Sequence, residues 1–171
     1  MNETNMIIPL EERLSSEDYL RRDDPLAELS SFELGVRRFY YDQNLSISID
    51  IGNESKEVFL FPDICLLIER LPEKIAALSH GQPIKLEFPE SWFSIELEPT
   101  DESVIGRLRE YGGAVVSRPF ELNLAQVLHT LTSFSAKIVQ LAVDGEYISQ
   151  EEADQFLAKT PEVNGFQRMI S

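Results

Sequence analysis

The sequence predicts an α+β protein, in which helices pack on one face of a mainly antiparallel sheet of six to seven strands. Segments of alternating apolar and polar residues come in runs joined by short turns, not in alternation with helices. The strongest helical pattern comes late, over 124–142. The apolar fraction of 43% and the charged fraction of 26% are those of a globular domain. The expected order is an arm, three strands, a helix, four strands and two helices.

The chain of 171 residues suits one domain with extensions at both ends. Residues 1–31 are rich in acids and poor in apolar groups, which predicts an N-terminal arm with one short helix at most. Residues 32–160 are expected to form the single domain. Residues 161–171 are expected to form a C-terminal tail.

The first three strands are predicted from their spacing. Apolar residues alternate from Phe32 to Val36 and continue in a cluster to residue 41, which predicts the first strand. Residues 45–51 give the cleanest pattern, with leucine and isoleucine at the odd positions and serine and aspartate at the even ones. Residues 58–61 predict a short strand that is more fully buried.

A helix is predicted to begin at Asp63, because a carboxylate at that position can accept hydrogen bonds from first-turn amides. Apolar residues then recur at helical spacing as far as Leu71. Pro72 cannot continue the hydrogen-bond ladder, so a break is expected there, with Pro72 starting a second helix. Gly81 is expected in the left-handed conformation that ends a helix.

Two hairpins are predicted next. The first is joined by residues 89–92, and the second by Gly112-Gly113. Their strands are predicted over residues 84–88, 93–97, 104–111 and 114–122.

The last two helices carry sequence signals for their first turns. Asn123 is the predicted N-cap of the long helix, with Gln126 in the position of a capping-box partner. Ser149 and Glu152 form a second capping box and open a short helix that ends near residue 158.

The net charge of −15 limits the partners. Such a surface repels the phosphates of nucleic acid and anionic membranes, and it attracts a basic protein partner. An acidic surface that serves no partner is the equal alternative. The N-terminus lacks the basic start and apolar stretch of a signal peptide, and no window approaches the ~20 apolar residues of a membrane span. We therefore expect a cytoplasmic protein that binds neither nucleic acid nor membrane.

No catalytic or metal-binding group stands out. Cys65 lies in an apolar run and is interpreted as a buried, inert thiol, while His80 and His129 are too isolated for a thiolate–imidazole zinc site. Nucleophile elbows, phosphate loops and dinucleotide fingerprints are missing from the sequence. Residues 144–152 resemble half of a calcium loop but lack its early acids. We expect no cofactor, and the sequence favours a non-enzymatic protein.

Trp92, in the first predicted hairpin loop, is the candidate contact with a protein partner, because tryptophan is enriched at interface hot spots. The alternative is a ring folded back over the edge of the sheet.

Charged residues on the predicted outer face of the sheet are further candidates. Glu87, Glu96 and Glu98 are expected to face water, where they could contact a basic partner. Arg107 and Arg109 share a face of their strand and are candidates for contact with an anion. The alternative is that both arginines pair with neighbouring glutamates across the strands, as Lys85 is expected to do with Glu96.

The segment 32–142 resembles small bacterial α+β domains of the immunity-protein and uncharacterised type. The shared features are the strand at 46–51, residues 57–61 leading into a helix, the strands within 84–97 and the long final helix. The resemblance implies a toxin-neutralising or other protein-binding role without catalysis, and it carries over no binding residue.

Three hypotheses follow from the sequence. The first is a non-enzymatic protein-binding protein, immunity-like or adaptor-like, that acts through its acidic surface. The second is an enzyme or small-ligand binder with a pocket that no motif marks. The third is a structural homodimer whose arms are exchanged.

Overall fold

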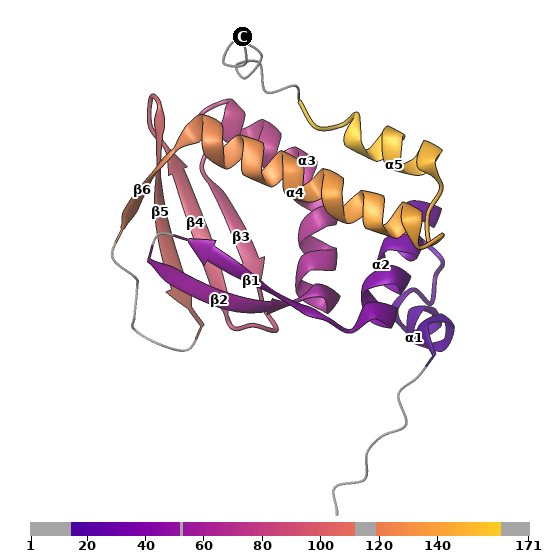
Figure 1. Ribbon diagram of the computed structural model, residues 1–171. Helices are drawn as coiled ribbons and strands as arrows, with labels where there is room; N and C mark the ends of the chain where they lie inside the picture. Colours follow the sequence, from indigo (N-terminus) through magenta and orange to yellow (C-terminus); the bar gives the residue numbers. More distant parts are fainter. Residues whose placement is uncertain (1–14, 52, 112–118, 162–171) are drawn as a thin grey trace, which may run out of the picture.

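The computed structural model describes residues 15–51, 53–111 and 119–161 and shows an α+β fold, as predicted (Figure 1). Its elements run in the order α1 (Ser16–Asp23), α2 (Ser31–Gln43), β1 (Ser46–Ile51), β2 (Glu54–Phe59), the π-helical turn η1 (Leu60–Ile64), α3 (Cys65–Ser79), β3 (Ile84–Phe88), β4 (Phe93–Pro99), β5 (Ser103–Glu110), β6 (Phe120–Asn123), α4 (Leu124–Asp144) and α5 (Gln150–Leu157).

The strands of the described residues form two antiparallel sheets, where one had been predicted. β1 and β2 pair as a hairpin, and β3 to β6 form a four-stranded sheet in chain order. The hairpin lies across the larger sheet, with the helices grouped beside it (Figure 1). The alternating isoleucines of β1 pack against the common core, and Lys56 of β2 pairs with Glu110 of β5. The hairpin is therefore attached through its side chains and not through a shared hydrogen-bond ladder.

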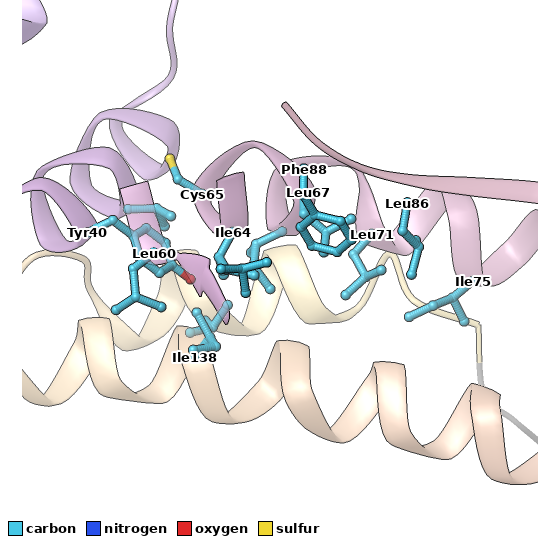
Figure 2. Packing of buried hydrophobic residues seen from close by; sticks show 14 of the residues in the cluster. Tyr40, Leu60, Ile64, Cys65, Leu67, Leu71, Ile75, Leu86, Phe88 and Ile138 are labelled. Atoms are coloured by element: carbon cyan, nitrogen blue, oxygen red, sulfur yellow. The ribbon is translucent and has the colours of Figure 1, made fainter. Parts of the chain in front are cut away.

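A single hydrophobic core joins the helices to the larger sheet. Phe88 and Phe93 stack on each other across the β3–β4 hairpin, with ring centroids 4.6 Å apart. Figure 2 shows Tyr40 of α2, Leu60 of η1 and Ile138 of α4 in this core, and side chains of α3 facing those of β3. Each fully buried side chain of this size contributes about 1.5–3 kcal/mol relative to an exposed one. This core fixes how the helical end of the molecule is placed against the sheet.

The strand predicted over 32–41 is wrong, because this segment forms most of α2. Ser30 and Glu33 form a capping box, in which each side chain accepts a hydrogen bond from the other residue's backbone amide. Apolar residues at 32, 36, 39 and 40 also fit one face of a helix, so the alternation over 32–36 was ambiguous. The capping box settles the ambiguity in favour of the helix.

The break predicted at Pro72 is also wrong, because α3 runs through it without interruption. A proline inside a helix costs about 3 kcal/mol. Here Pro72 is buried, and its neighbours Leu71 and Ile75 on this helix are fully buried in the core. Burial along this face outweighs the lost hydrogen bond.

Other predicted boundaries are confirmed. Gly81 has a φ of 75°, and Asn123 caps α4 by accepting a hydrogen bond from the amide of Gln126. The short helix predicted in the arm is α1, and the Ser149–Glu152 capping box opens α5. Residues 1–14, most of the predicted strand at 114–122 and nearly all of the predicted tail lie outside the described residues. Within the described part of the chain, none of the helices combines the length and the apolar character needed to cross a membrane.

Candidate functional site

A buried carboxylate holds the loop between β3 and β4 (residues 89–92). Asp63 is fully buried, and its Oδ1 accepts a hydrogen bond from the amide of Glu90 at 3.0 Å. Its Oδ2 accepts two more from Ser91, from the amide at 3.1 Å and from Oγ at 2.6 Å. The prediction that Asp63 caps the following helix is therefore wrong, because its carboxylate binds the loop instead. A buried carboxylate is tolerated only when it is hydrogen-bonded, so Asp63 and the loop stabilise each other.

This loop presents Trp92 to solvent. The side chain is 66% exposed, whereas the next residue, Phe93, is buried in the core. The backbone of Trp92 is fixed on both sides, since its amide donates to Pro89 O at 3.3 Å and its carbonyl accepts from the amide of Tyr111 at 2.9 Å. The exposure of 66% places most of the ring surface in solvent.

Trp92 also has an unfavourable backbone conformation, with a φ of 61°. A residue with a side chain costs about 1–3 kcal/mol in this left-handed region. The three hydrogen bonds to Asp63 and the burial of Phe93 hold the chain there. Strain of this kind is concentrated at functional sites, so the exposed indole is the first candidate for a functional contact.

Two more exposed apolar side chains lie on segments joined to this loop. Phe59, at the end of β2, is 51% exposed, and Leu66, in the first turn of α3, is 42% exposed. Asp63 lies between them in the sequence and connects their segment to residues 90 and 91. The loop and the η1 segment together form an end of the molecule with apolar groups in solvent.

The charged residues predicted on the outer face of the sheet are paired with one another. Lys85 and Glu96 are Cα partners across β3 and β4, as expected, but the ammonium of Lys85 contacts Glu87 instead. The hydrogen bond with Glu87 raises the pKa of Lys85. The three ion pairs are Lys85–Glu87 at 3.1 Å, Arg109–Glu96 at 2.8 Å and Arg107–Glu98 at 2.9 Å.

Each of the three cations on this face is paired with a carboxylate, and Glu121 of β6 adds a fourth carboxylate to the same face, so most of the acidity of the protein lies elsewhere. Both guanidinium groups of the predicted anion contact, Arg107 and Arg109, already touch carboxylates of their own chain. Exposed pairs of this kind contribute about 0–1 kcal/mol each. Trp92 lies in the loop that joins two of these strands, β3 and β4.

A groove lies between the N-terminal turn of α2 and helix α5, and we call it the α2–α5 groove. It has a volume of about 420 Å³. One side is apolar, because Phe32 and Phe156 stack with centroids 4.4 Å apart and planes 19° apart. The lining residues are Ser30, Ser31, Phe32, Glu33, Glu69, Glu152, Gln155, Phe156 and Lys159.

The carboxylates of this groove are held in fixed positions. Glu152 accepts hydrogen bonds from the Oγ of Ser31 and from the backbone and side chain of Ser149. These bonds, the one from Ser31 first, lower the pKa of Glu152. Burial would raise the pKa of Glu33, but hydrogen bonds from the backbone and side chain of Ser30 outweigh it, so the pKa is lowered overall. Both groups are ionised at neutral pH.

Glu69 contributes to the groove from α3 and is neutralised by α2. Arg37 donates to it through two nitrogens, with Nε at 2.7 Å from Oε1 and Nη2 at 2.9 Å from Oε2. The two side chains are only 13% and 12% exposed. Such a bidentate, largely buried pair fixes the position of α2 on α3. Nearby, burial raises the pKa of Tyr40 well above its ordinary value.

Cys65, His80 and His129 lie apart from one another in the structure. Cys65 is fully buried in the core. His80 contacts the carbonyl of Ala76 at the end of α3, and His129 is exposed on α4. In the described ranges, His, Cys, Asp and Glu side chains do not gather in any group of three or more that could hold a metal ion.

The sequence did not predict the α2–α5 groove, although part of its signal was present. The capping box of Ser149 and Glu152 was recognised, but the equivalent box of Ser30 and Glu33 was hidden by the alternation that follows it. Comparisons of the chain with protein-family models, with curated proteins and with solved structures gave no match, so the function is argued from this geometry.

Proposed function

We propose that the chain is a non-enzymatic protein-binding protein of the cytoplasm, immunity-like or adaptor-like in role, and that Trp92 lies at the centre of its interface. One observation supports this most directly. An exposed tryptophan is held in a strained conformation by a loop that the fully buried carboxylate of Asp63 fixes in place.

A fixed anchor of this kind suits binding better than it suits stability. Exposing an indole costs hydrophobic free energy in the free protein, and the φ of Trp92 costs more. The first cost is recovered when a partner covers the ring, while the second is borne by the fold in order to present the indole. Because the loop is already ordered, little conformational entropy is lost on association. Phe59 and Leu66 are exposed on the segment that Asp63 joins to this loop, and we include them in the proposed interface.

The partner is expected to be basic, since the chain has a net charge of −15. Long-range attraction between opposite charges raises the association rate and is weakened by salt. The indole and its apolar neighbours would then provide the short-range contact that salt affects little.

Affinity capture with matched variants tests this proposal. Wild type, Trp92→Ala and Leu26→Ala are immobilised, and bound proteins are compared at low and high salt. Leu26 is an even more exposed apolar residue, so it controls for loss of apolar surface. We expect wild type and Leu26→Ala to capture the same basic protein. Trp92→Ala should capture about tenfold less of it, or even less. Equal capture by all three, or none by any, would overturn the proposal.

The purified complex gives a second measurement. Trp92 is the only tryptophan of the chain, so its fluorescence reports the interface alone when the partner has none. Burial of the ring should shift its emission to shorter wavelength and reduce quenching by acrylamide. The molar mass of the free chain, measured by light scattering, shows whether the partner is a second copy.

A further inference from the structure

We propose that the α2–α5 groove binds a basic segment of a second protein, with one lysine or arginine side chain placed between Glu33 and Glu152. The groove lies at the helical end of the molecule, whereas Trp92 projects from a loop of the four-stranded sheet (Figure 1). The inference therefore does not depend on the proposed role of Trp92.

The charges of the groove favour a cation. Glu33, Glu69 and Glu152 line it together with a single ammonium, that of Lys159. Arg37 neutralises Glu69 from behind, in the bidentate pair. Arg37 and Lys159 also attract Glu33, so the three carboxylates of the groove stand against two cations. The first turn of α5 adds the exposed Glu151 to the same surface, so the local charge remains negative.

The two carboxylates are also positioned to accept further hydrogen bonds. Both hydrogen bonds that Glu33 accepts from Ser30 fall on Oε2, which leaves Oε1 available within the described residues. Glu152 is fixed from two helices at once, by Ser31 of α2 and by Ser149 at the start of α5. Carboxylates that are already fixed lose little freedom when they bind an ammonium or guanidinium group.

The apolar side of the groove suits the stem of such a residue. Lysine and arginine bury their methylene chains against apolar surface while their charge stays with polar groups. Phe32, which is partly exposed and stacks on the buried Phe156, supplies that surface in the groove. The volume of about 420 Å³ is within the range of small binding sites, roughly 300–1,000 Å³, and exceeds what a single metal ion would require.

The test is a titration of the full chain, labelled with ¹⁵N, followed by backbone amide chemical shifts. The probe is the peptide acetyl-(Ala-Lys)₃-amide, and acetyl-(Ala-Glu)₃-amide is its charge-reversed control. Saturable shifts centred on amides 30–33 and 149–156 are expected with the lysine peptide and not with the glutamate peptide.

Two double variants give the same change of charge at different places. Glu33→Gln/Glu152→Gln keeps side chains that can still cap both helices, and it should weaken binding by about tenfold. Glu87→Gln/Glu98→Gln changes the outer face of the sheet and should leave binding within about twofold, since exposed pairs contribute little. Equal weakening by both pairs would show general charge attraction and would overturn the proposal.

The same amide shifts distinguish a basic protein segment from three other possible ligands of the groove. Shifts at amides 30–33 and 149–156 on deletion of residues 162–171, without peptide, would assign the groove to the chain's own C-terminal segment. Binding of lysine amide as tight as that of the peptide would indicate a free organic cation. Shifts of these amides with magnesium or calcium chloride would indicate a metal ion. Each of these results, like a lack of shifts with the lysine peptide, would contradict a basic protein segment.

Discussion

Ser91 donates two hydrogen bonds, from its amide and from Oγ, to the same oxygen of the Asp63 carboxylate, across 28 positions of the sequence. The buried acid thereby joins η1, the segment directly before α3, to the loop that carries Trp92. Without it, the strained conformation of Trp92 would have only two backbone hydrogen bonds and the neighbouring Phe93 to hold it.

Asp63→Asn is expected to destabilise the fold and loosen the loop. The amide keeps the shape of the carboxylate but has one acceptor oxygen, so at least one donor of Glu90 or Ser91 loses its partner. Leaving buried groups unpaired costs about 1–3 kcal/mol, and more where a charge was involved. Urea unfolding should therefore show a loss of about 2–3 kcal/mol, with faster amide exchange at residues 90 and 91.

Asp101→Asn provides the matched control, since Asp101 is exposed in the turn between β4 and β5. Its free energy of unfolding should stay within about 0.5 kcal/mol of wild type. Similar losses in the two variants would mean that the Asp63 hydrogen bonds contribute nothing specific.

The Arg37–Glu69 pair should show strong coupling in a double-mutant cycle. Either alanine substitution alone removes the bidentate partner of a largely buried charge, which is expected to cost about 2–4 kcal/mol. The double substitution removes both charges and should cost less than the sum, by about 1 kcal/mol or more. Thermal or urea unfolding of the four proteins measures this. If the two losses of stability are additive, the side chains act independently, although Nε of Arg37 lies only 2.7 Å from Oε1 of Glu69.

How far the sequence predicts this structure depends on the range of the interactions involved. Strands β3 to β5 were predicted because alternation within each strand already determines which side faces the core. The helix α2 was missed because Phe32, Leu34 and Val36 fit a strand as well as a helix over so short a run. Only the capping box at Ser30 distinguishes the two.

The sites depend on pairings that no local pattern contains. Trp92 was identified by residue type, but its presentation depends on Asp63, which reads locally as an ordinary helix cap. The α2–α5 groove depends on the bond between Ser31 and Glu152, which are 121 positions apart. Long-range contacts of this kind follow from the packing of complete helices and cannot be predicted from spacing along the chain.

Gly35→Ala should destabilise the protein although Gly35 lies inside a helix. In an exposed helix the change would stabilise by about 1 kcal/mol. Here an added Cβ would lie 2.4 Å from both the carbonyl oxygen of Tyr147 and Cγ2 of Ile148. Because one of these atoms is backbone, α2 has to shift away from the turn after α4, and overpacking of this kind costs about 1–3 kcal/mol. A lowered Tm is expected, whereas a raised Tm would show that α2 is not packed this closely.

The lowered pKa values of Glu33 and Glu152 predict acid sensitivity at the helical end. A carboxyl group whose pKa is lower in the folded state stabilises the fold above its unfolded pKa, and that stabilisation is lost as the pH falls through the folded pKa. The contribution should therefore be complete at pH 7 and decline as the pH falls below about 5. Glu33→Gln/Glu152→Gln removes both titrations, so its Tm should lie below that of wild type at pH 7, and the difference should shrink steadily as the pH is lowered through the folded pKa values of the two groups. The other carboxyl groups are common to both proteins and cancel in the difference. A difference in Tm that stays constant with pH would show that the two carboxylates stabilise the fold no better than neutral amides at the same positions.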